Sequence, residues 1–165
     1  MPGTSAHMML TLTSLATILK LIGAPLRSIL PAAAPAILAD MLIDLGHTGS
    51  GRSAATHSII TAPIIALMAY MPAAALAYIA GPLLEALGLE AATLLTLMLW
   101  GCLYASILHL SLDSLTWQGI HIPLIGWVNL AGLESRGAAA NLIPVSLSLL
   151  LMLVFWMGGG IWTPT

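Results

Sequence analysis

The scarcity of charged residues constrains the fold of this chain more than any other sequence feature. No charged residue precedes Lys20, none lies between Arg52 and Glu85, and none follows Arg136. Only 6% of the 165 residues are charged, whereas 59% are hydrophobic, and the mean hydropathy is +1.03. A helix that crosses a bilayer needs about 20 mostly apolar residues, and several stretches meet that requirement. The sequence therefore predicts an integral membrane protein.

Hydrophobic runs predict an all-α integral membrane bundle of about five transmembrane or membrane-embedded helices. We expect these helices over residues 7–22, 29–46, 53 to 70 or 80, 91–115 and 138–157. Pro31 and Pro35 are assigned to the start of the second helix, and residues 81–90 and 117–137 to loops. No basic residue precedes the first apolar run, so a cleaved signal peptide is not expected. Residues 1–165 are predicted to form a single membrane-embedded helical domain, a multi-pass protein of the cell membrane.

Five spans would separate the polar residues between the two sides of the membrane. One side receives the histidines, the aspartates at helix ends and one arginine: His7, Asp44, His47, Arg52, His57, His109, Asp113 and His121. The other side receives Lys20, Arg27, Glu85 and Glu90. Basic residues are balanced across the two sides, so the positive-inside rule leaves the orientation open.

Two clusters combine carboxylates with imidazoles at helical spacing. Asp40, Asp44 and His47 are separated by four and three residues, which would place them on one face of a helix. His109 and Asp113 repeat the four-residue spacing. Ionisable side chains inside a membrane are costly and mark functional sites, and two such faces meeting in a bundle would form a mixed His/Asp metal site. These ligands suit zinc, manganese or iron, and we expect a divalent metal, zinc or manganese.

The segment GSGRSAATHS, residues 49–58, is interpreted as the start of the third helix, with one of its serines as the cap. A helix N-terminus attracts anions, and Arg52 would add a bidentate clamp for phosphate or carboxylate. His57 would lie one turn inside that helix. Asp40 is interpreted either as a general base or as a partner of Arg27 or Ser28 across a turn.

Each of these residues also has a plainer interpretation. Asp44 or Asp113 alone would be a helix-end residue wetted by lipid headgroups, and Arg52 alone would be a headgroup anchor. His7 and His121, taken singly, fit the membrane interface better than a ligand set. The conjunction of two clusters, a histidine at a helix start and one shared membrane face favours a polar functional site.

Three ordered blocks of the sequence carry a resemblance to a known family. They are IDLGH (43–47), GRSAATHSIITAP (51–63) and HLSLDSLTWQGIHIP (109–123). Together they resemble the YdjM-like family of membrane-bound proteins assigned as metal-dependent hydrolases, and are closest to its archaeal relatives of unknown function. A histidine near the start of the chain, here His7, belongs to the same pattern, as does the NLIPVSLSLLLM tail (141–152). Bacterial members have a histidine immediately before the arginine, where this chain has Gly51.

The resemblance implies a hydrolase whose metal is held by six side chains: His7, Asp44, His47, His57, His109 and Asp113. We therefore expect a metal-dependent hydrolase that acts at the bilayer surface on a phosphoester or lipid-derived substrate, with Asp40 and Arg52 as its catalytic residues. The expected partners are the lipid bilayer and an anionic small-molecule or lipid substrate. The alternative is a non-enzymatic membrane protein, either an ion or proton carrier or a small scaffold. A net charge of -2 with four basic residues argues against nucleic-acid binding.

Overall fold

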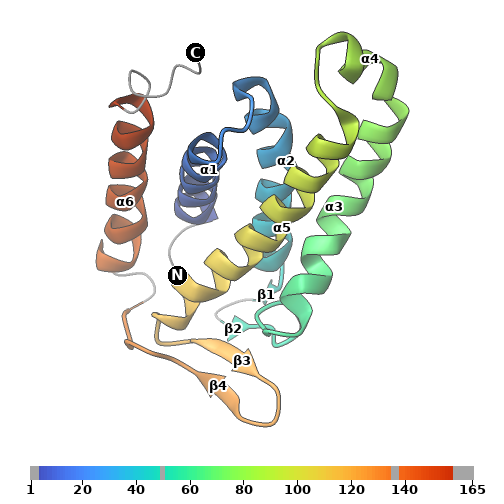
Figure 1. Ribbon diagram of the computed structural model, residues 1–165. Coiled ribbons are helices and arrows are strands. Elements are labelled where there is room, and N and C mark those ends of the chain that lie inside the picture. Colours follow the sequence, from blue (N-terminus) through green and yellow to red (C-terminus); the bar gives the residue numbers. More distant parts are fainter. Residues whose placement is uncertain (1–3, 49–50, 135–137, 158–165) are drawn as a thin grey trace.

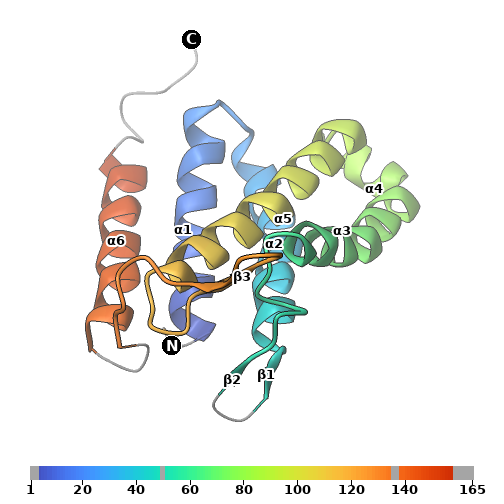
Figure 2. The same ribbon diagram turned by 90° about the horizontal axis from the view of Figure 1, so that it is seen from below.

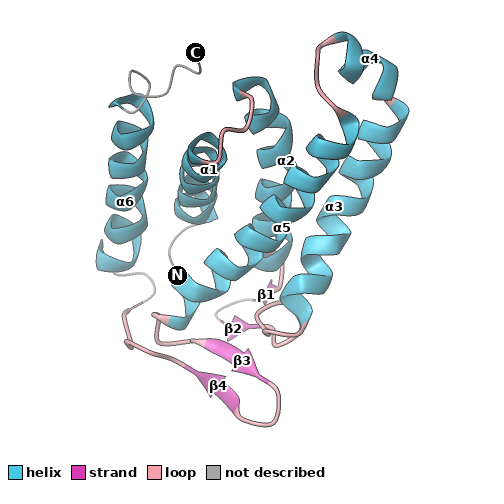
Figure 3. Ribbon diagram, in the orientation of Figure 1, coloured by secondary structure: helices cyan, strands magenta, loops and turns pink. Residues whose placement is uncertain are grey.

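Helices make up most of the chain in the computed structural model, which describes residues 4–48, 51–134 and 138–157 (Figure 1). The helices of this described part are α1 (Thr4–Leu21), α2 (Leu26–Asp44), α3 (Thr61–Ile79), the short α4 (Gly81–Ala86), α5 (Ala91–Ser114) and α6 (Ala138–Met157). Two small antiparallel hairpins follow α2 and α5: β1 (His47–Thr48) with β2 (Gly51–Arg52), and β3 (Ile120–Ile122) with β4 (Gly126–Val128) (Figure 3). The predicted all-α class is confirmed.

Three of these helices have the length and composition needed to cross a membrane. They are α2, α3 and α5, and a shorter apolar helix covers residues Asn141–Phe155 within α6. Large apolar side chains such as Met68, Met71 and Ile79 stand exposed on α3. A large exposed apolar surface marks a membrane or partner contact. The length and apolar composition of these helices support the predicted membrane protein.

The helices pack through small residues at the centre of the bundle. α5 crosses α2 and lies beside α3, whereas α1 packs on α2 and α6 covers the outer side of α1 (Figures 1 and 2). Ala32 and Ala36 of α2 are fully buried, and a Cβ on Gly101 of α5 would lie 3.1 Å from the carbonyl oxygen of Ala32. Cys102 is buried beside them, as expected of a small apolar side chain. Close contact through small residues is typical of helix pairs in membranes.

The start of the third helix differs from the prediction. α3 begins at Thr61, not near Ser53, and its first turn has no side-chain cap. The backbone N–H groups of Thr56 and His57 both donate to the carbonyl oxygen of Ser53, which closes a single turn. The chain then pairs with β3, since His121 N donates to His57 O at 2.8 Å and Ile59 N donates to His121 O at 3.3 Å. These pairings with a distant strand replace the helical hydrogen bonds that the local sequence predicts.

The second helix also differs at both ends. It begins at Leu26, so Pro31 and Pro35 lie inside it, and such prolines are tolerated in membrane helices. It ends at Asp44, and His47 lies in β1 and not on the helical face predicted for it. The chain turns at Gly46, where a Cβ would lie only 1.8 Å from Thr56 Oγ1. Only a glycine allows the end of α2 to approach the segment before α3 this closely.

Both predicted loops contain short regular elements. α4 occupies the first part of residues 81–90, and the β3–β4 hairpin lies within residues 117–137. Gly119, which precedes β3, has a positive φ of 65°, a conformation that glycine adopts readily. A Cβ there would lie 2.1 Å from the carbonyl oxygen of Val128, so the hairpin also needs glycine for close packing.

Candidate metal centre

Histidines and aspartates from four parts of the chain meet at the end of the bundle where α1 begins and α2 and α5 end (Figure 1). His7 comes from α1, Asp44 from α2, His57 from the segment before α3, and His109 and Asp113 from α5. Asp44 is 9% exposed, and the other four side chains are between 0% and 1% exposed. Buried charged side chains are unusual, because a buried carboxylate needs a positively charged partner or a metal ion to balance its charge.

The three imidazoles converge on the carboxylate of Asp113. The Nε2 atom of His7 lies 3.6 Å from Asp113 Oδ1, while Nε2 of His57 and Nε2 of His109 lie 3.4 Å and 3.3 Å from Asp113 Oδ2. His109 Nε2 also lies 3.5 Å from Asp44 Oδ1. These distances exceed the usual N–H···O length of about 3.0 Å. They match the separation of about 3.3–3.4 Å between two ligands of a tetrahedral ion with bonds of about 2.1 Å.

Two sets of ligand atoms are close enough to share an ion. Ligand atoms of His7, His109 and Asp113 all lie within 4.8 Å of one another, and so do those of Asp44, His57 and His109. The rings of His7 and His109 stack, with centroids 4.1 Å apart and an interplanar angle of 15°. Two imidazolium cations would repel one another in this arrangement, so the stack requires at least one neutral ring. A neutral ring is also the form that binds a metal.

Several buried polar atoms of the cluster have no hydrogen-bond partner among the residues that the structure describes. They are both ring nitrogens of His7, Nε2 of His109 and Oδ2 of Asp113. Leaving a buried polar atom without a partner costs about 1–3 kcal/mol, and such atoms in a protein commonly face an ion or an ordered water. A cation at the point of convergence would bind one nitrogen of His7, Nε2 of His109 and Oδ2 of Asp113. The donor set therefore fits a divalent metal.

Further hydrogen bonds orient the converging side chains. Asp40 is fully buried, and its Oδ1 lies 3.2 Å from Nδ1 of His109. Thr56 Oγ1 lies 2.8 Å from Nδ1 of His57. A partner on Nδ1 fixes the ring and directs Nε2 toward the cluster, as in the carboxylate–histidine–metal arrangement of known metal sites.

Arg52 holds Asp113 from the other side. Its Nη2 donates to Asp113 Oδ1, and its Nη1 donates to Thr116 Oγ1 at 2.8 Å and to the carbonyl oxygen of Gly119 at 2.7 Å. Burial lowers the pKa of the Arg52 guanidinium, whereas the carboxylates of Asp113 and Asp44 raise it. An arginine keeps its charge in such surroundings. Arg52 therefore joins α5 to the loop before β3.

The buried charges of this region do not cancel. Asp40, Asp44 and Asp113 are carboxylates, and Arg52 is the cation that contacts them within the described part of the chain. With neutral histidines, two negative charges remain. Burying uncompensated charge costs several kcal/mol per ion, and one divalent cation would balance it.

The structure brings together five of the six predicted metal ligands: His7, Asp44, His57, His109 and Asp113. The side chain of His47 lies outside the described part of the structure, although its backbone pairs with Arg52 across the β1–β2 hairpin. His121 is in neither group of ligand atoms; its ring lies 5.6 Å from that of Trp127, although its backbone N–H donates to the carbonyl oxygen of His57.

The two residues predicted to be catalytic have other contacts. Arg52 does not stand at a helix N-terminus, because α3 begins at Thr61, and its guanidinium already binds Asp113. Asp40 binds His109, not Arg27, so its position is that of an orienting group.

Two residues that bind Arg52 were not among the predicted site residues, although both lie in the block 109–123 that carries the family resemblance. Thr116 and Gly119 accept hydrogen bonds from Arg52, and each acts through its position after the end of α5. Their signal in the sequence is their place in that block, where they follow Asp113 by three and six residues. Nothing in their own chemistry distinguishes them from other loop residues.

Comparison of the chain with family models, with curated proteins and with solved structures finds no match in any of the three. The resemblance to the YdjM-like family therefore rests on the sequence blocks 43–47, 51–63 and 109–123. These blocks contain four of the five converging side chains: Asp44, His57, His109 and Asp113.

Proposed function

We propose that this protein is a metal-dependent hydrolase of the cell membrane, related to the YdjM-like family and built on five membrane-embedded helices. Zinc or manganese would bind at the cluster of His7, Asp44, His57, His109 and Asp113. The observation that carries the proposal is the spacing of 3.3–3.6 Å between the imidazole Nε2 atoms and the facing carboxylate oxygens. This spacing is long for hydrogen bonds and suits ligands that share one ion.

The residues in and around the cluster would have different roles in metal binding and in positioning. When bound, a divalent ion supplies Lewis acidity and activates water for attack on an ester or phosphoester. Asp40 keeps Nε2 of His109 directed at the cluster through its contact with Nδ1, and Arg52 fixes the carboxylate of Asp113. Asp44 is the most exposed of the three buried carboxylates, so among the proposed metal ligands it lies closest to the surface. Asp40 and Arg52 would therefore act as positioning residues.

Elemental analysis of the detergent-purified protein tests the proposal. We expect about one divalent transition metal per chain in the wild type and no bound metal in His109→Ala, because His109 Nε2 lies near both Asp44 and Asp113. His121→Ala is the matched control, since it removes a histidine side chain that contacts Trp127 and is in neither group of ligand atoms. It should keep its metal.

Hydrolysis assays complete the test. The metal-loaded wild type and His121→Ala should cleave a lipid ester or phosphoester, and His109→Ala should not. A metal-free wild type that is folded, and that carries ions or protons across proteoliposomes in an Asp44-dependent manner, would instead establish the carrier alternative.

Gly46→Ala is predicted to weaken metal binding without removing any ligand. The new Cβ would lie 1.8 Å from Thr56 Oγ1, so Thr56 must move away from Nδ1 of His57. Loss of an orienting partner of this kind lowers metal affinity by about 10–100-fold, measurable by competition with a chromogenic chelator. Gly81→Ala is the control, because a Cβ there meets nothing within 4 Å. Equal affinities for the two variants would contradict the role assigned to Thr56.

A further inference from the structure

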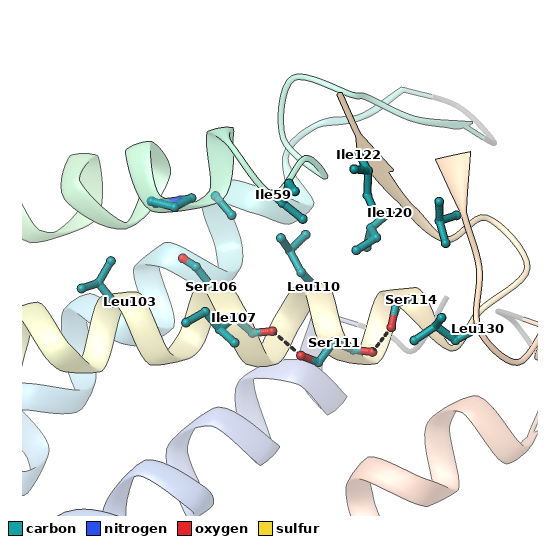
Figure 4. Close-up of a pocket in the computed structure, with 13 residues that line it drawn as sticks. Ile59, Leu103, Ser106, Ile107, Leu110, Ser111, Ser114, Ile120, Ile122 and Leu130 are labelled. Atoms are coloured by element: carbon teal, nitrogen blue, oxygen red, sulfur yellow. Dashed lines mark hydrogen bonds between the residues drawn. The ribbon is translucent and has the colours of Figure 1, made fainter. Parts of the chain in front are cut away.

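A pocket of about 360 Å³ lies between the start of α3, the second half of α5 and the β3–β4 hairpin (Figure 4). Its volume is in the range of about 300–1,000 Å³ found for small-molecule sites. Apolar side chains form most of its wall, among them Ile59, Leu103, Ile107, Leu110, Ile120 and Ile122. The pocket therefore suits an apolar ligand.

The pocket and the metal cluster share a wall. Leu110 and Ser114 of the pocket directly follow His109 and Asp113 along α5. At about 100° per residue, Ser106 lies about 60° around the helix from His109. On the other side, the backbone of His57 pairs with His121, the residue between Ile120 and Ile122 of the pocket. The same backbone segments thus position both sites.

Ser106 is the polar group that the pocket leaves unused. Its side chain is 1% exposed, and its hydroxyl has no hydrogen-bond partner among the described residues. The other two serines of the pocket are satisfied within α5, since Ser111 donates to the carbonyl oxygen of Ile107 and Ser114 to that of Ser111, both at 2.7 Å (Figure 4). Figure 4 shows Ser106 on the side of α5 that faces the pocket. Its hydroxyl is available to a ligand there.

The mouth of the pocket favours entry from the bilayer. α3 and α5 are both long and apolar enough to span a membrane, and the pocket lies between them. Ile107 and Leu130 on its wall are 65% and 72% exposed. A hydrophilic solute would have to cross this apolar surface, whereas a hydrocarbon chain would gain by burying it.

We propose that this pocket binds the alkyl chain of a lipid ester and that the Ser106 hydroxyl donates a hydrogen bond to the ester carbonyl at the polar end of that chain. The proposal names the substrate class of the hydrolase and so rests on the proposed function for its chemical step, in which water splits the ester into an acid and an alcohol. Chain binding itself does not depend on the metal ligands.

Two ligands that resist hydrolysis separate carbonyl recognition from chain burial. One is the amide isostere of monopalmitoyl glycerol, which keeps the carbonyl, and the other is hexadecyl glycerol ether, which lacks it. Native mass spectrometry of the whole protein in detergent measures the affinity for each. The wild type should bind the amide about tenfold more tightly than the ether, the value of one hydrogen bond in a buried site. Ser106→Ala should bind both equally.

A pocket-filling variant tests where the chain lies. Leu103→Trp adds bulk inside the pocket and should weaken binding of both ligands at least tenfold. Leu99→Trp, one turn earlier on α5 and outside the pocket, should leave both affinities unchanged.

Two results would overturn the proposal. The first is an unchanged amide-to-ether ratio in Ser106→Ala, and the second is equal binding by Leu103→Trp and Leu99→Trp, as for lipid held loosely on the surface. The metal content of each variant is measured alongside. Normal chain binding by a protein without metal would refute the proposed hydrolase and leave the pocket assignment intact. If Leu103→Trp does not fold, the amide-to-ether affinity ratio of Ser106→Ala still tests the proposal.

Discussion

Asp113→Asn is expected to abolish metal binding and to lower the free energy of unfolding by about 3–5 kcal/mol. The carboxylate of Asp113 faces His7, His57 and His109 at 3.3–3.6 Å and accepts a hydrogen bond from Arg52. Asparagine keeps the size of the side chain but removes the charge, so a metal loses its central ligand. The Arg52 guanidinium then stays buried without its carboxylate.

A second substitution separates these two losses. Arg52→Met in the Asp113→Asn background removes the unpaired cation, and should recover part of the stability without restoring the metal. Denaturant titration in detergent and elemental analysis measure the two properties. Glu85→Gln, which neutralises an exposed carboxylate far along the chain, should change neither. An Asp113→Asn variant as stable as the wild type would show that the Arg52 contact does not support the fold.

The membrane helices could be predicted from the sequence because each depends on a local property, a run of apolar residues. Within a bilayer, an apolar segment outside a β-barrel satisfies its backbone N–H and C=O groups by forming a helix, so α2, α3 and α5 could be predicted from composition. Helical spacing likewise placed Asp40 and Asp44 together, and His109 with Asp113. The structure keeps both pairs on one face of their helices.

The start of α3 could not be predicted from the sequence because it depends on hydrogen bonds to residues that are distant in the chain. Residues 53–60 have the serines and small residues of a helix start, but the backbone of His57 and Ile59 pairs with His121 of β3. No local pattern reports that pairing. The same reason applies to Arg52, whose partners are distant in the sequence: Asp113 lies in the last turn of α5, and Thr116 and Gly119 follow that helix.

The sequence predicted only in part that the histidines would come together at one site. The alternation of helix directions placed His7, His57 and His109 at one end of the bundle. Their convergence on one carboxylate depends on how α1 packs on α2 and on the turn at Gly46. Sequence spacing limits which residues share a helix face, whereas contacts between helices decide which of those faces form a site.

Removal of the metal is expected to lower the melting temperature of the protein by roughly 8–16 °C. A ligand present at about a thousand times its dissociation constant stabilises the folded state by about 4 kcal/mol, and each kcal/mol corresponds to about 2–4 °C in a chain of this size. Without the ion, Asp40, Asp44 and Asp113 are buried, and Arg52 is the cation that contacts this group within residues 4–48, 51–134 and 138–157. Thermal scans in detergent, with and without a strong chelator, measure the shift.

Returning single ions to the chelated protein then identifies the metal. Zinc or manganese should restore the melting temperature at low concentration, and magnesium should not, because imidazole ligands suit the former ions better. Asp113→Asn is the control, since a chelator should not shift a protein that holds no metal. If chelation removes the metal and the melting temperature of the wild type stays the same, the buried charge must be balanced within the chain. A proton on His109, which lies between Asp40, Asp44 and Asp113, would then replace the metal as the counter-charge of this cluster.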